Sequence, residues 1–89
     1  MIISQRVHYR GRVQGVGFRM TAQRIATKYA VTGYVKNLAD GQVEILVTGE
    51  PDEIDRFLGA VATRMADYIQ HQDIQGEPVQ SFTHFEIRI

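Results

Sequence analysis

Apolar and basic residues alternate near the start of the chain, over residues 5–13. One side of this alternation consists of Val7, Tyr9, Gly11 and Val13. The other side consists of Arg6, His8, Arg10 and Arg12. A period of two is typical of a half-buried strand. We therefore predict a strand here, with one face packed on the core and one basic face exposed to solvent.

From Phe18 onward the period changes to that of a helix. One apolar stripe consists of Phe18, Ala22, Ile25, Ala26 and Tyr29. Residues 33–38 then predict a second strand. Residues 42–49 predict a third, whose inward side is Val43, Ile45 and Val47. The Asp-Gly pair at 40–41 tolerates positive φ, so it predicts the turn of a hairpin between these two strands.

The second half of the chain predicts another helix and one or two further strands. Pro51 suits a first helical position, and the acidic residues around it suit the positive end of a helix dipole. The apolar stripe that follows is Ile54, Phe57, Leu58, Val61 and Met65. Residues 68–75 show a weaker strand pattern. Residues 82–89 show a clear one, in which Phe85 and Ile87 alternate with Glu86 and Arg88.

The predicted order is β-α-β-β-α-β, with the last strand region open to division in two. This is the split βαβ or ferredoxin-like arrangement, an α+β fold in which two helices cover one face of an antiparallel sheet. We expect a single domain over residues 1–89, as a two-layer sandwich. The scaffold hosts many unrelated functions, so the fold by itself does not define one.

Composition narrows the range of chemistry. The chain has 89 residues, of which 44% are hydrophobic and none is cysteine. The absence of cysteine excludes disulfides, thiolate nucleophiles and thiolate metal sites. No apolar run approaches the ~20 residues needed to cross a bilayer, and the first ten residues do not form a signal peptide. We expect a cytoplasmic protein.

Charge is divided unevenly along the chain although the formal net charge is zero. Residues 1–36 contain seven basic residues and no acid, whereas residues 37–89 contain ten acids and three bases. A neutral total argues against broad nucleic-acid binding. The basic first part suits a small anionic ligand. The alternative is that the two parts lie close together in the fold, so that their opposite charges compensate one another.

The segment GRVQGVGFR, residues 11–19, joins the predicted first strand to the first helix and is a candidate anion site. The first N–H groups of a helix are unpaired and lie at the positive end of its dipole. Gly15 and Gly17 let successive N–H groups point at one spot, and Arg19 adds a two-pronged donor suited to phosphate. The two common glycine-rich phosphate motifs are excluded, because the Lys-Ser/Thr pair and the third glycine are missing. The alternative is a tight connection whose glycines serve only geometry.

Asn37, near the end of the predicted second strand, is the second candidate. An asparagine amide both donates and accepts hydrogen bonds, so it can hold a water molecule. If the first and second strands are neighbours, Asn37 approaches the start of the first helix. The alternative is a turn-forming asparagine.

Other polar residues give weaker signals. His8, His71 and His84 have no metal-ligand spacing, and we interpret them as solvent-facing or edge-strand residues. Asp40 and Glu44 are a candidate carboxylate pair, although Asp40 is better explained as a turn residue. The basic row of the first strand lacks the stacking aromatics that usually accompany RNA binding on a sheet.

Two motifs of this chain resemble the signatures of the acylphosphatases. The first comprises Gly11 and then the run from Val13 to Arg19. The second comprises the run Gly33 to Asn37, followed at the family's spacing by Gly41, Val43 and Gly49. Together they cover residues 11–49, and the closing FEIRI resembles the family's last strand. Residues 66–81 lack the Gly-Pro pair often seen there in the family, so the resemblance does not define their course.

The resemblance implies an enzyme that hydrolyses acyl phosphates to carboxylate and phosphate. It implies that Arg19 binds the phosphate and that Asn37 orients the attacking water. The loop backbone would complete the phosphate site through Gly15, Val16, Gly17 and Phe18. No metal or cofactor is implied. We expect a monomer whose partners are small acyl phosphates, phosphate or other small oxyanions, with no nucleic acid and no membrane.

Two classes of alternative remain at this point. The first is a module that binds a phosphorylated metabolite without turnover, and the second is a small RNA-binding or regulatory domain. Domains of this kind also begin the large carbamoyltransferases of hydrogenase maturation, although the end of this chain directly after its last strand argues against such a fragment. The presence of both Arg19 and Asn37 favours catalysis, because a pure binder needs the arginine but not the water-holding amide.

Overall fold

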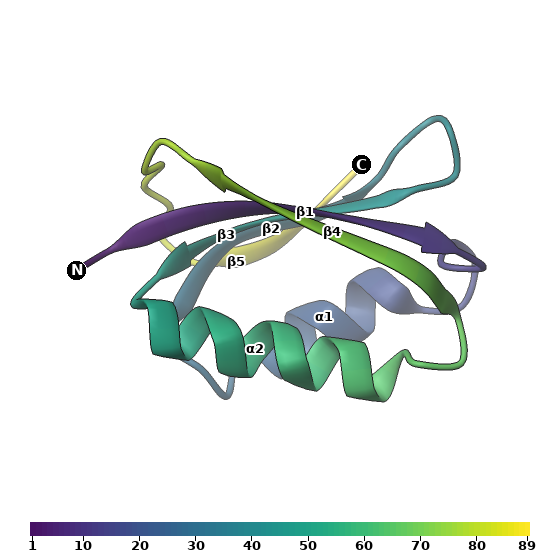
Figure 1. Ribbon diagram of the computed structural model, residues 1–89, viewed down its shortest axis with the longest axis horizontal. Helices are drawn as coiled ribbons and strands as arrows, with labels where there is room; N and C mark the ends of the chain where they lie inside the picture. Colours follow the sequence, from purple (N-terminus) through teal and green to yellow (C-terminus); the bar gives the residue numbers. More distant parts are fainter.

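The computed structural model describes residues 1–89 and shows two layers, a five-stranded sheet with both helices on one face (Figure 1). This confirms the predicted α+β, ferredoxin-like fold. The elements follow in the order β1 (Ile3–Gly11), α1 (Phe18–Ala26), β2 (Val31–Asn37), β3 (Val43–Gly49), α2 (Pro51–Arg64), β4 (Ile69–Glu77) and β5 (Phe85–Arg88).

The strand order in the sheet is β4-β1-β3-β2-β5. All neighbouring pairs are antiparallel except β2 and β5, which are parallel. The premise that the first and second strands are neighbours is therefore wrong. After α1 the chain re-enters the sheet as β2, with a space of one strand between β2 and β1. β3 occupies that space and pairs antiparallel with both β1 and β2. In this register Tyr9 pairs with Val43, and Val43 pairs with Asn37.

The last two strands differ in their bounds from the sequence prediction. The fourth runs from Ile69 to Glu77, longer than the predicted 68–75, and the last is confined to Phe85–Arg88. β4 is an edge strand whose residues 70–76 are all exposed, so its sequence carries little apolar alternation. Residues 78–84 cross from one edge of the sheet to the other, and Phe82 packs edge-on against Tyr34 at 6.0 Å between ring centroids.

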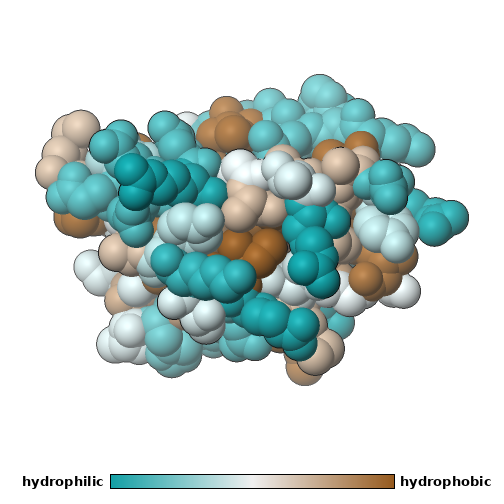
Figure 2. Space-filling view, turned by 90° about the horizontal axis from the view of Figure 1, so that it is seen from below, coloured by the Kyte–Doolittle hydropathy of each residue, from teal (hydrophilic) through white to brown (hydrophobic).

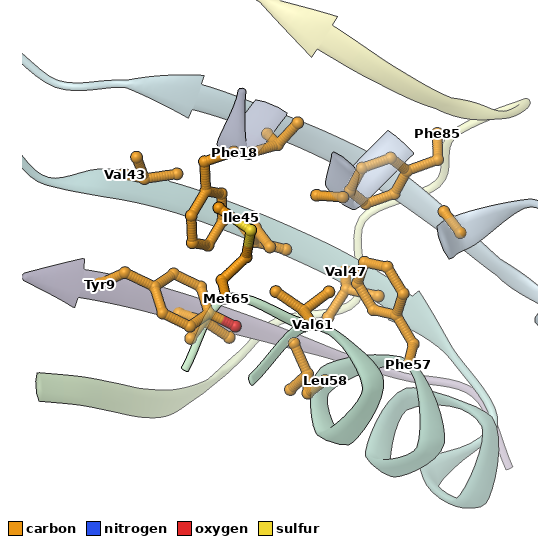
Figure 3. Close-up of a cluster of buried hydrophobic side chains, with 14 of the residues drawn as sticks. Tyr9, Phe18, Val43, Ile45, Val47, Phe57, Leu58, Val61, Met65 and Phe85 are labelled. Atoms are coloured by element: carbon orange, nitrogen blue, oxygen red, sulfur yellow. The ribbon is translucent and has the colours of Figure 1, made fainter. Parts of the chain in front are cut away.

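The core lies between the sheet and the two helices, as Figure 3 shows. Tyr9 of β1 packs against Phe18 at the start of α1, with ring centroids 4.9 Å apart. Phe57 of α2 packs against Phe85 of β5 at 5.2 Å. These aromatic pairs fix the start of α1 and the position of β5 against the sheet. The predicted inward residues of the third strand are all fully buried: Val43, Ile45 and Val47.

The outer side of the helical layer is mostly hydrophilic, with hydrophobic atoms showing in patches between polar side chains (Figure 2). Both helices are amphipathic, and their buried residues are those predicted from the apolar stripes, among them Ala22 in α1 and Val61 in α2. Neither helix is long and apolar enough to span a membrane.

Candidate active site

The loop between β1 and α1 has the curled backbone expected of an anion site. Gly15 and Gly17 both have φ of 77°, in the left-handed region that other residues rarely adopt. Gly17 is the N-cap of α1, and no side chain hydrogen-bonds to the amides of the first helical turn. That turn also contains no acidic residue. The free amides and the helix dipole therefore leave this end of α1 positive.

Arg19 and Asn37 lie at the same small pocket. Its volume is about 160 Å³, and its lining consists of Val13, Gly15, Gly17, Phe18, Arg19, Met20 and Asn37. Five of the six predicted site residues thus line one pocket. The sixth, Val16, is partly buried and packs against the hydrophobic core instead. No carboxylate or imidazole lines the pocket.

Gln14 connects the loop to the turn between β2 and β3. Its side-chain Nε2 donates to the carbonyl oxygens of Leu38 and Gln42, each at 2.8 Å. The loop after β1 and the β2–β3 turn lie at the same end of the molecule in Figure 1. Because β3 separates β1 from β2, this amide is what joins the loop to the segment that follows Asn37. Gln14 was not among the predicted site residues, and its position inside the first motif was the only signal for it in the sequence.

The guanidinium of Arg19 is held by the last strand. Its Nη1 donates to the backbone carbonyl oxygen of Arg88 at 3.2 Å. β5 runs parallel to β2, and Arg88 pairs with Lys36, the neighbour of Asn37. The last residues of β5 therefore lie at the same end of the sheet as Asn37. The side chain of Arg19 keeps its remaining N–H groups for a ligand.

A buried carboxylate, Glu44, lies on the other face of the sheet from the pocket. It accepts hydrogen bonds from the Tyr34 hydroxyl and from His8 Nε2, each at 2.8 Å, and Arg6 Nη1 lies 3.0 Å away. Lys36 Nζ completes the group at 3.8 Å. Burial alone would raise the pKa of Glu44, but the hydrogen bonds from His8, Tyr34 and Arg6 outweigh it and hold the pKa below its ordinary value.

The structure confirms the turn explanation of Asp40 and corrects the expectations for His8 and for the basic row. Glu44 and Asp40 do not form a carboxylate pair: Asp40 accepts hydrogen bonds from Gln42 within the turn, which lower its pKa, and it serves as the turn residue. His8 is neither on an edge strand nor free in solvent, because β1 is an inner strand and its imidazole contacts Glu44. The basic row is also partly neutralised, since Arg6 pairs with both Glu44 and Glu77. His71 and His84 are exposed, as expected.

Comparison with known proteins agrees with this fold. The family model described as Acylphosphatase matches residues 5–87. An acylphosphatase of Thermoplasma volcanium is 35% identical over 89 residues, covering 99% of each chain. The crystal structure of an acylphosphatase from Bacillus subtilis superposes with a TM-score of 0.85 at 33% identity, over all of both chains. The chain therefore belongs to the acylphosphatase family, a family of hydrolases.

A larger protein contains a similar domain. HypF of Thermococcus kodakarensis superposes with a TM-score of 0.82 at 33% identity. The match covers 100% of this chain but only 12% of HypF. The likeness is thus to one domain of that protein.

We predict that Gln14→Ala lowers the free energy of unfolding by about 1–3 kcal/mol, because two hydrogen bonds of about 0.5–1.5 kcal/mol each are lost. The carbonyl oxygens of Leu38 and Gln42 each keep one backbone donor. Urea unfolding of the variant and the wild type measures this difference. Gln70→Ala, an exposed glutamine on the edge strand, is the matched control and should change little. Equal stability of Gln14→Ala and the wild type would show that the amide does not hold the loop to the turn.

We predict that Glu44→Gln lowers stability at neutral pH and that its deficit shrinks in acid. The folded-state pKa of Glu44 lies below its ordinary value of 4.5, so the carboxylate stabilises the fold above that value and the stabilisation is lost as the pH falls through the folded pKa. Urea unfolding at several pH values tests this, with the exposed Asp55→Asn as control. A deficit that stays constant down to acidic pH would contradict the assignment of the ionised cluster.

Proposed function

We propose that this protein hydrolyses the carboxyl-phosphate anhydride bond of acyl phosphates, and that the pocket at Arg19 and Asn37 is its active site. The observation that carries the proposal is that these two side chains line one small pocket with the curled loop and the uncapped start of α1. Membership of the acylphosphatase family supports the reaction class.

Binding of the phosphate group is assigned to Arg19 and to the loop amides. A guanidinium matches two phosphate oxygens at once. The backbone N–H groups between Gly15 and Arg19 add donors at the positive end of α1. The absence of any carboxylate from the pocket lining leaves this positive potential uncompensated. The pocket therefore binds the phosphoryl group that is transferred, and not the acyl half of the substrate.

Asn37 is assigned to the water. Its amide accepts a hydrogen bond from the attacking water while it donates to another acceptor. The water oxygen forms a bond to phosphorus, the bond from phosphorus to the acyl oxygen breaks, and the carboxylate leaves with the bonding electron pair. The proton of the water passes to a phosphate oxygen, since no imidazole or carboxylate lines the pocket.

The reaction needs little more than this set of groups. The leaving carboxylate has a conjugate-acid pKa on the order of 4, so it departs without a general acid. Phosphoryl transfer depends mainly on positioning and on charge stabilisation. Holding the water in line contributes up to about 7–11 kcal/mol in favourable cases. We also propose that the protein acts as a cytoplasmic monomer, and the resemblance to the family implies no metal or cofactor.

We predict that benzoyl phosphate is hydrolysed in the presence of a chelator and that Arg19→Ala and Asn37→Ala each lower kcat/KM by about 10²–10³-fold. Arg12→Ala is the control, because Arg12 is exposed and does not line the pocket. Circular dichroism should show that all variants are folded.

Two other results would overturn parts of the proposal. A wild type that binds phosphate in an Arg19-dependent way but does not turn over would be a binding module. A rate that depends on an essential enzyme group with a pKa near neutrality would contradict proton transfer to the phosphate itself.

A further inference from the structure

The pocket at Arg19 is large enough for a phosphate group but not for a whole substrate with a large acyl group. Its volume is about 160 Å³, whereas pockets that enclose small organic ligands usually measure about 300–1,000 Å³. The acyl half of an acyl phosphate must therefore lie outside it. The molecule has two other hollows, and only one of them adjoins this pocket.

The adjoining hollow, here called the α1 groove, lies between the outer side of α1, the first residues of β2 and residues 83–85. Its volume is about 580 Å³. Met20 lines both the phosphate pocket and the α1 groove, so the groove begins where the pocket ends. The third hollow, beside Arg10, shares no lining residue with the phosphate pocket.

The α1 groove follows the helix away from the phosphate pocket. Arg19 lies in the first turn of α1, and Arg24 is five residues further on, which is about 7.5 Å along the helix axis. Gln23 and Thr27 line the groove on the same side of the helix. Arg24 also lies about 140° around the helix from Arg19. An acyl group of several carbon atoms therefore reaches Arg24 where the flexible arginine side chain bends toward the α1 groove that it lines.

The α1 groove combines an apolar floor with an arginine and a histidine at its rim. Val31 and Phe85 are buried at its base, whereas Arg24 and His84 are exposed at its edge. No carboxylate lines it, and Arg24 takes part in none of the ion pairs of the molecule. His84 Nδ1 lies 2.9 Å from the Thr83 hydroxyl, which leaves Nε2 for a ligand. These surroundings favour an apolar chain that ends in an anionic group.

We infer that the α1 groove binds the acyl half of the substrate and selects acyl phosphates whose acyl group carries a second anion, which pairs with Arg24. This inference rests on the proposed function, because it places the leaving group of that reaction. Arg24 is then a specificity residue. It contacts the distal end of the leaving group in both the ground state and the transition state, so it acts on KM and leaves the chemical step unchanged.

A matched set of substrates tests the groove. Benzoyl phosphate and 4-carboxybenzoyl phosphate differ in one carboxylate, and acetyl phosphate has no group that reaches Arg24. The quantity to measure is the ratio of kcat/KM for 4-carboxybenzoyl phosphate to that for benzoyl phosphate. In Arg24→Gln we expect this ratio to fall about two- to fivefold through KM, as for an exposed ion pair. Hydrolysis of acetyl phosphate should not change, and added salt should reduce the effect.

Arg10→Gln is the matched control, because it removes an exposed arginine that lines the hollow apart from the site. It should leave the substrate ratio at the wild-type value. If Arg24→Gln leaves the ratio unchanged, or if Arg10→Gln lowers it equally, the groove assignment is wrong while the proposed function stands. If the wild type hydrolyses none of the three substrates, the proposed function is wrong and the groove assignment falls with it.

Discussion

The pairing of β3 with both β1 and β2 determines where every part of the site lies. It places the last residues of β1 and β2 at the same end of the sheet but two strand spacings apart, which is about 10 Å. The loop that leaves β1 and the turn that follows Asn37 must be joined across that distance. The side chain of Gln14 does so with two hydrogen bonds to carbonyl oxygens of the turn. β5 is the parallel partner of β2. At the same end of the sheet, its Arg88 carbonyl oxygen accepts a hydrogen bond from Arg19.

The two faces of the sheet have separate tasks. The helix side carries the core and the phosphate pocket, and Asn37 lies on it in the same alternation as the buried Val35. The opposite side carries the ionised cluster around Glu44, which bonds to residues of β1 and β2 from the central strand. The cluster thereby holds the three strands in register from behind the site. This separation keeps carboxylates away from the pocket, whose positive potential the proposed chemistry requires.

The helices were predictable because their apolar periods reflect burial on one face only. β3 is buried on both faces, but Val43, Ile45 and Val47 still alternate with the polar Glu44 and Thr48 of its far face. Prediction failed where that relation is lost. β4 is exposed along residues 70–76, so its composition does not show its length, and residues 82–84 read as strand although they belong to the crossing segment. The strand order was not evident either, because no local pattern tells whether β3 returns beside β2 alone or also beside β1.

Some parts of the candidate site could likewise be predicted from the sequence, and others could not. Gly15, Gly17 and Arg19 could be identified because a curled backbone before a helix requires particular residue types. The approach of Asn37 was anticipated from a wrong premise, adjacency of β1 and β2. β3 lies between these strands, and Gln14 links the loop to the turn that follows Asn37. That contact joins residues 24 positions apart in the chain, and the contact between Glu44 and His8 joins residues 36 positions apart. Such pairings depend on the register of the sheet, which the sequence does not display.

The most direct test of the account is a titration with inorganic phosphate followed by the amide NMR signals of the protein. The account predicts saturable shifts in the backbone amides from Gly15 to Arg19 and in the side-chain amide of Asn37, all with one dissociation constant. It also predicts that these shifts disappear in Arg19→Ala. Shifts confined to another surface, or loop shifts that leave the Asn37 amide unaffected, would contradict the claim that the loop, the arginine and the asparagine form one phosphate site.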